Sequence, residues 1–112
     1  MNTVVKTVLV ATLATSMLGC AGLMQSASVM EAHKAYDEGE YQQTLVLITQ
    51  AENARETTPE MQAELVYLKA SSYEQLGQVA VASTLYEYLA AEHSDSQYGY
   101  LASSKLEQQQ KE

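Results

Sequence analysis

The chain has 112 residues and carries 14 acidic side chains against six lysines and arginines, for a formal net charge of −8. This excess of negative charge, without any cluster of basic residues, argues against binding to nucleic acid or to anionic lipid head groups. One proline and five glycines leave most of the chain free to form helices, and the length is that of one small domain.

The first 19 residues have the pattern of an export signal. A short polar start contains one lysine, Lys6, and an apolar run follows over residues 7–18 before small residues appear. The run is about a dozen residues long, shorter than the ~20 residues that a membrane-spanning helix needs. We therefore predict a signal peptide over residues 1–19 rather than a permanent transmembrane anchor.

The only cysteine of the chain, Cys20, lies directly after this run. Exported proteins normally have paired cysteines or none, so its position needs an explanation. Met17-Leu18-Gly19-Cys20 resembles the lipobox of bacterial lipoproteins, although Met17 stands where that family usually has Leu, Val or Ile. The resemblance implies cleavage before Cys20 and its acylation, for example with palmitate. The alternative is an ordinary signal peptide cut near Ser28, with Cys20 discarded.

Membrane attachment would then depend on the acyl chains of Cys20, since two or three chains hold a protein firmly. In enterobacteria-like sorting an Asp after the cysteine retains a lipoprotein at the inner membrane, whereas this chain has Ala21. The resemblance therefore implies the outer membrane, on the periplasmic side. Residues 20–28 are expected to form the acylated cysteine and a tether.

Beyond the tether, apolar residues recur at the three- and four-residue spacing of helices. A first helix is predicted to begin at Ser26 or Ser28, either of which can cap it, and to end near Gly39. A second is predicted from about Glu40 to Arg55.

The third predicted helix has the clearest start signal, Thr57-Thr58-Pro59-Glu60, in which Thr57 can cap and Glu60 can reciprocate. This helix is apolar over more than half its circumference and is expected to pack on two sides before it ends at Gly77.

A fourth helix is predicted from about Gln78 to His93, followed by a turn at Ser94-Asp95-Ser96. A fifth is predicted from Gln97 to about Gln108, after which residues 108–112 form a polar tail.

Two stretches of the chain resemble each other, residues 35–41 around Gly39 and residues 72–79 around Gly77. They are similar to the tetratricopeptide repeat, a pair of helices of ~34 residues. The resemblance covers residues 29–107 and implies an all-α, right-handed stack of helical hairpins, with about two repeats and a closing helix. Lys69, Thr44 and Ser94 depart from the family pattern. An unrelated small helical bundle is the alternative.

No pattern in the sequence supports catalysis, a metal or a cofactor. His33 and Asp37 have a spacing that a metal could use, but no further ligands accompany them. His93, Ser94 and Asp95 are neighbours at a helix end and do not aim at one another as a catalytic triad must. We therefore expect a protein that is not an enzyme.

Partner binding is the remaining function. The resemblance implies a groove lined by the first helix of each hairpin, with these matching residues: His33, Tyr36, Glu64, Tyr67, Ser71, Glu74, Tyr98 and Lys105. Tyrosines mixed with acids are common in recognition surfaces. The alternative for Tyr67 and Tyr98 is that they pack between helices. We expect a scaffold that holds protein partners during assembly of a cell-envelope complex. The alternative is a module that binds a small ligand or a peptidoglycan fragment.

A stack this short leaves an open face on the first hairpin, because about three repeats are normally needed to bury a solenoid core. Either the fifth helix caps the stack, or a partner or a second copy of the chain covers this face. Val46 and Leu47, which lie off the main apolar stripe of the second helix, are expected to face such a neighbour. The alternative is that they sit against the third helix or the tether.

Overall fold

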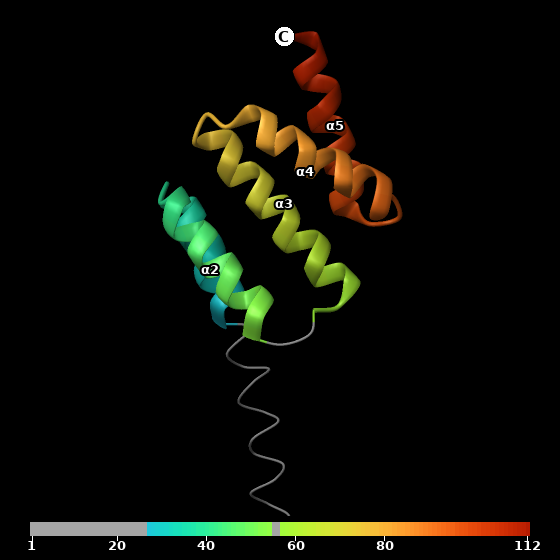
Figure 1. Cartoon of the computed structure of the whole chain (residues 1–112). Coiled ribbons are helices and arrows are strands. Elements are labelled where there is room, and N and C mark those ends of the chain that lie inside the picture. The colour runs from blue at the N-terminus through green and yellow to red at the C-terminus, as the bar shows by residue number, and fades with distance from the viewer. Residues whose placement is uncertain (1–26, 55–56) are drawn as a thin grey trace, which may run out of the picture.

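The computed structural model describes residues 27–54 and 57–112. Among these residues there is no strand, and helices account for all but short turns. Residues 27–37 are helical, and then come α2 (Tyr41–Ala54), α3 (Pro59–Gln75), α4 (Val79–Glu92) and α5 (Gln97–Lys111) (Figure 1). The predicted all-α class is confirmed. The predicted signal peptide, Cys20 and residues 21–26 lie outside the described residues.

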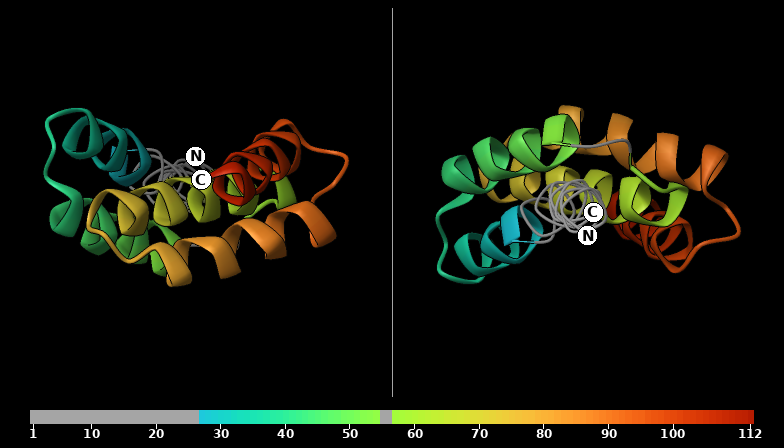
Figure 2. Two further views of the ribbon diagram at one scale, coloured as in Figure 1. Left: turned by 90° about the horizontal axis from the view of Figure 1, so that it is seen from above. Right: turned by 90° about the horizontal axis from the view of Figure 1, so that it is seen from below.

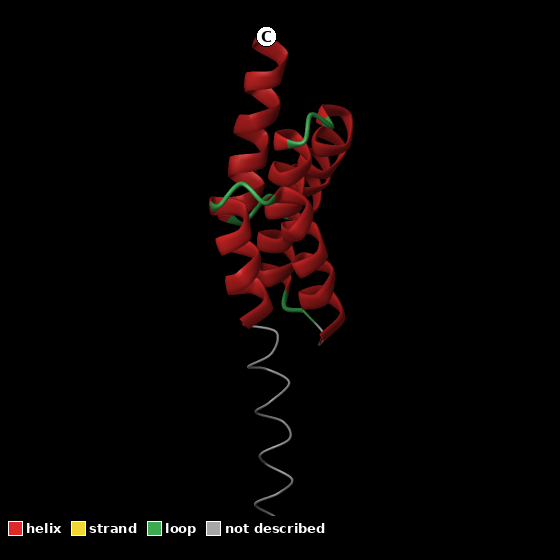
Figure 3. Cartoon of the chain, turned by 90° about the vertical axis from the view of Figure 1, so that its left-hand side faces the viewer, coloured by secondary structure: helices red, strands yellow, loops and turns green. Residues whose placement is uncertain are grey.

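The helices stack as hairpins, with contacts between α2 and α3, α3 and α4, α4 and α5, and α3 and α5. Figure 3 shows them running side by side. In both views of Figure 2, helix 27–37 and α5 lie on one side of α3, and α2 and α4 lie on the other. We call the side formed by helix 27–37, α3 and α5 the inner face. No described helix combines the length and hydropathy required to cross a membrane.

Two side-chain caps fix where α3 and α5 begin. The Thr58 hydroxyl accepts a hydrogen bond from the Met61 amide at 3.2 Å, so the cap expected at Thr57 is displaced by one residue. The reason is Pro59, which forces the residue before it into the extended backbone that a cap requires. At α5 the Ser96 hydroxyl accepts from the Gly99 amide at 3.1 Å, which confirms the predicted turn and cap.

The core has two parts, and α3 contributes to both. The first part joins α3 to the first hairpin through apolar side chains: Ala32, Ala35, Leu47, Ile48, Ala51, Leu65 and Leu68. The second joins α3 to α4 and α5: Ala63, Ala70, Ala82, Tyr86, Leu89 and Ala102. The expectation that the third helix packs on two sides is therefore confirmed.

The structure corrects two expectations, one about Leu47 and one about the end of the last helix. Leu47 is 7% exposed and belongs to the first part of the core, so only Val46, at 49%, faces outward. The helix at the C-terminus does not fray at Gln108 but continues to Lys111. Its last turns are held because Gln109 accepts a hydrogen bond from the Ser83 hydroxyl at 2.7 Å and donates one to Glu74 at 3.5 Å.

Alanine substitutions at two glycines, Gly99 and Gly77, test this packing. A Cβ on Gly99 would lie 2.0 Å from the His93 carbonyl oxygen, whereas Gly39 and Gly77 have open space and positive φ angles of 78° and 80°. We expect Gly99→Ala to lower the free energy of unfolding by about 3 kcal/mol, because backbone atoms must move. Gly77→Ala should cost about 1 to 2 kcal/mol from the left-handed backbone alone. Urea denaturation followed by circular dichroism measures both, and equal losses would contradict the close approach of α5 to α4.

Candidate functional site

Three helices supply the eight predicted binding residues, seven of them on the inner face and one, Ser71, beneath it. Helix 27–37 supplies His33 and Tyr36, and α5 supplies Tyr98 and Lys105. The four from α3 recur at three- and four-residue spacing along one side of that helix: Glu64, Tyr67, Ser71 and Glu74. The contacts described next join residues of neighbouring helices.

A hydrogen bond and an ion pair cross the inner face. The His33 ring Nε2 lies 2.8 Å from Glu64 Oε1 in the hydrogen bond, and Lys105 Nζ lies 3.1 Å from Glu74 Oε1 in the ion pair. Burial alone would lower the pKa of Lys105, but the hydrogen bond and the negative charge of Glu74 outweigh it, so that its pKa is raised. Each contact joins α3 to a neighbouring helix, so these side chains hold the inner face together as well as line it.

A group of tyrosine rings occupies the middle of the inner face. The Tyr67 ring centroid lies 5.8 Å from that of Tyr86 and 5.8 Å from that of Tyr98, within the range of favourable aromatic pairs. Tyr86 is fully buried, and its hydroxyl lies 3.2 Å from Ser71 Oγ. Ser71, 7% exposed, therefore lies beneath the inner face rather than on it.

The tyrosine hydroxyls hold their protons strongly. Burial is the largest cause for Tyr36, Tyr86 and Tyr98, and it raises the pKa of each of the three. At Tyr98 the charges of Glu64 and Glu60 also act in this direction, while a hydrogen bond with Gln97 opposes them. These hydroxyls consequently remain hydrogen-bond donors throughout the physiological pH range.

Small hollows lie at both ends of α3 on this face. One, of about 290 Å³, is lined by Glu64 and Tyr98 together with Glu60 and Gln97. The other, of about 300 Å³, is lined by Glu74 and Lys105 together with Val79 and the end of α5. The tyrosine group separates the two hollows, so the inner face offers two shallow anchoring positions rather than one deep cavity.

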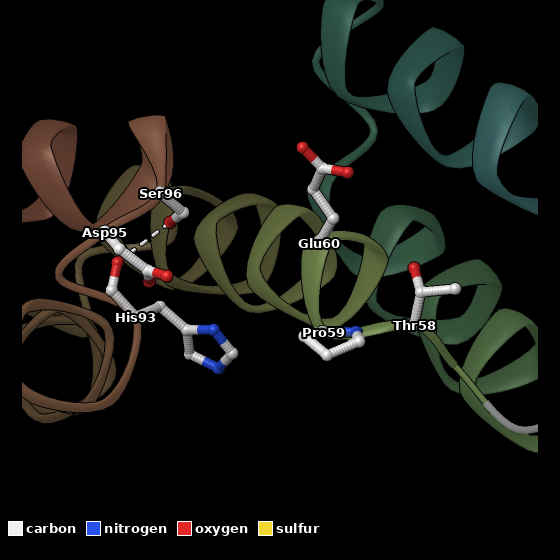
Figure 4. A pocket seen from close by; sticks show the side chains of 6 residues that line it. All are labelled: Thr58, Pro59, Glu60, His93, Asp95 and Ser96. Atoms are coloured by element: carbon white, nitrogen blue, oxygen red, sulfur yellow. Dashed lines mark hydrogen bonds between the residues drawn. The ribbon is translucent and has the colours of Figure 1, made fainter.

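A third hollow, of about 330 Å³, lies where α3 begins and α4 ends (Figure 4). The Ser96 hydroxyl here donates to the backbone carbonyl of His93 at 2.9 Å, and the His93 ring packs edge-on against Tyr88 at 5.7 Å. Neither contact joins the imidazole to the side chain of Ser94, Asp95 or Ser96, and no other hydrogen bond among the described residues does. His93, Ser94 and Asp95 are therefore not linked as the nucleophile, base and orienting group of a triad.

Metal binding finds no geometric support in the described part of the chain. Nowhere in residues 27–54 and 57–112 do three or more His, Cys, Asp or Glu side chains gather as ligands for a metal ion. His33 is bonded to Glu64 on α3 instead of acting with Asp37 on its own helix.

Sequence reasoning missed several residues that complete the inner face. Glu60 and Gln97 line the first hollow, and Gln75 forms a side-chain hydrogen bond with Tyr36. The position of Glu60 was readable, since it lies one turn before Glu64 on the same side of a helix. Gln97 and Gln75 had no such signal, because polar residues at helix ends are usually solvated.

The chain was compared with family models, with curated proteins and with solved structures. No family model, no curated protein and no solved structure matches it.

Alkaline pH should weaken the fold. In the folded protein Tyr36, Tyr86, Tyr98 and Lys105 all have a raised pKa, so the unfolded chain releases their protons first as the pH rises. Their stabilisation is complete below the unfolded pKa of about 10 and is lost progressively as the pH rises from there through the folded pKa. We expect the free energy of unfolding, measured in urea, to fall from about pH 10 upward.

Tyr86→Phe isolates the largest of these effects. It should cost about 1 kcal/mol at neutral pH, because the buried Ser71 hydroxyl loses its partner, and it should make the alkaline decline shallower. Tyr100→Phe, at a position 72% exposed, is the matched control and should leave the decline as steep as in the wild type. An unchanged slope in Tyr86→Phe would show that its burial does not govern the alkaline transition.

Proposed function

We propose that the chain is a non-enzymatic lipoprotein of the outer membrane, anchored through Cys20 on the periplasmic side, which holds a protein partner during assembly of a cell-envelope complex. Its helical stack would correspond to about two tetratricopeptide-like repeats and a closing helix. The observation that carries the proposal is the inner face, where tyrosine and charged side chains from three helices converge.

The chemistry of the inner face suits a protein segment better than a small molecule. Tyrosine rings offer a large contact area with a polar tip, and they lose little conformational entropy on binding. The two hollows on this face, of about 290 and 300 Å³, are at the lower limit of the ~300–1,000 Å³ typical of small-molecule pockets. An extended or helical segment could use both hollows with the tyrosine group between them.

Anchoring at Cys20 would keep this face near the membrane. Six residues separate Cys20 from the first described residue, and a segment of that length spans at most ~20 Å. A partner of the inner face would therefore be a protein at or close to the inner surface of the outer membrane.

Metabolic labelling with palmitate tests the anchor. The wild-type chain should incorporate label, and Cys20→Ala should lose it because the acceptor sulfur is absent. Met17→Leu, which brings the cleavage site closer to the lipobox pattern, should retain the label. A wild-type chain that carries no label would exclude the lipoprotein.

Site-specific photo-crosslinking in intact cells tests the inner face. A benzoylphenylalanine at position 98 should crosslink to a protein partner, because Tyr98 borders a hollow of this face. The same group at position 100 is a matched control, since Tyr100 lies on the same helix and is 72% exposed. Adducts from position 100 and none from position 98 would contradict the assignment of the face. The absence of protein adducts from position 98 and from a second inner position, 36, would favour the small-ligand alternative.

A further inference from the structure

A second surface lies on the opposite side of α3 from the inner face. Both α2 and α4 lie on this side (Figure 2), yet they make no contact with each other. A hollow of about 460 Å³ opens between them over α3. We call this hollow the outer channel, and six of its lining residues matter here: Glu52, Leu65, Val66, Lys69, Leu85 and Tyr88.

The lining of the outer channel combines apolar residues with an ion pair and two uncharged polar residues, Thr57 and Gln62. Lys69 Nζ lies 2.9 Å from Glu52 Oε1, so these two charges satisfy each other across α2 and α3. This contact also accounts for Lys69 at a position where the repeat pattern usually has leucine. Val66 of α3 and Leu85 of α4, both partly exposed, supply apolar surface beside the pair, while Leu65 is fully buried beneath them. An occupant therefore meets apolar surface bordered by polar groups, with no net charge.

A stripe along α4 extends this apolar surface. Val81, Leu85 and Tyr88 follow at the four- and three-residue spacing of one helix side. Val81 is 42% exposed and Tyr88 is 39% exposed, although both are large apolar side chains. Single exposed apolar residues are ordinary on a protein surface, but a row of them beside a channel is the pattern that a second helix packs against.

The end of the stripe is acidic. Glu92 lies four residues after Tyr88, is exposed, and has no ion-pair partner among the described residues. A basic residue on the occupant would complement it. The net charge of −8 acts in the same direction, because it opposes a second copy of the chain and favours a basic partner.

We propose that the outer channel is a docking surface for an amphipathic helix of a protein partner, with an apolar stripe that packs against Val81, Leu85 and Tyr88 and a basic residue that pairs with Glu92. This surface is separate from the inner face, so its assignment does not rest on the function proposed above. With both surfaces in use the chain would bridge two proteins, one on each side of α3.

Peptide binding tests the proposal directly. The full-length protein, purified in a mild nonionic detergent whether or not Cys20 is acylated, is titrated into a fluorescent helical peptide of about 15 residues, with leucines at three- and four-residue spacing flanked by lysines. The same detergent without protein gives the background. A second peptide has glutamates in place of the lysines. We expect saturable binding of the lysine peptide and at least about tenfold weaker binding of the glutamate peptide, a difference of about 1.4 kcal/mol.

Matched variants locate the binding site. Val81→Ser with Tyr88→Ser should weaken binding of the lysine peptide at least about tenfold. Tyr100→Ser with Leu101→Ser removes two large apolar side chains at exposed positions outside the channel and should change binding less than about twofold. Equal affinities of the two double variants, or no saturable binding by the wild type, would overturn the proposal.

Substitutions at two exposed carboxylates give a second test that does not depend on whether Val81→Ser/Tyr88→Ser folds. Glu92→Gln should reduce the preference for the lysine peptide over the glutamate peptide, whereas Glu87→Gln, on another side of α4, should not. If Glu92→Gln kept the wild-type preference for the lysine peptide over the glutamate peptide, a basic residue of the partner that pairs with Glu92 would be excluded. Sedimentation that shows a wild-type dimer and a monomeric Val81→Ser/Tyr88→Ser variant would assign the channel to a second copy and reject the helix of another protein.

Discussion

The burial of α3 on both of its sides is the constraint on which the other helices depend. Leu65 and Leu68 pack into the first hairpin, while Ala63 and Ala70 pack against α4 and α5. Each apolar side of α3 must be covered, since exposed apolar surface costs roughly 25 cal/mol per Å². The two hairpins are therefore held next to each other by their common neighbour, and the positions of the inner face and the outer channel follow from this arrangement.

Small and hydroxyl-bearing residues let α3 fit between its neighbours without unsatisfied polar groups. Ser72 is buried and donates to the Leu68 carbonyl at 2.8 Å, and Ser71 meets the hydroxyl of Tyr86. No side-chain nitrogen or oxygen buried within the described residues lacks a hydrogen-bond partner. A buried hydroxyl with a partner costs little, whereas an unpaired one is destabilising by about 1 to 3 kcal/mol. Tyr86 can thus be the largest fully buried side chain of the second core.

Local signals in the sequence predicted the helices and turns well, because turns and caps depend on a few neighbouring residues. Gly39 and Gly77 both adopt the positive φ expected of a turn glycine, and Ser96 caps its helix. The cap of α3 is Thr58 and not Thr57, because Pro59 holds the residue before it in the extended backbone of a cap, and this outweighs the capping-pair spacing between Thr57 and Glu60.

Contacts between helices were harder to predict, since periodicity gives the side of a helix but not its neighbour. Leu47 was expected outside and lies in the core, while Ser71 was expected on the inner face and lies beneath it. The His33–Glu64 hydrogen bond and the Lys105–Glu74 ion pair were also missed, because each joins residues 31 positions apart. The eight proposed binding residues came from the resemblance to the tetratricopeptide repeat, and their side chains come from the three helices of the inner face, with Ser71 buried beneath it.

The division of the core around α3 also determines how the molecule can come apart. Helix 27–37 and α2 share one set of apolar contacts, α4 and α5 share another, and only α3 takes part in both. Loss of either hairpin leaves the other still packed on α3, so opening from one end need not carry the whole chain with it. Cooperativity across the molecule therefore rests on a single helix of 17 residues.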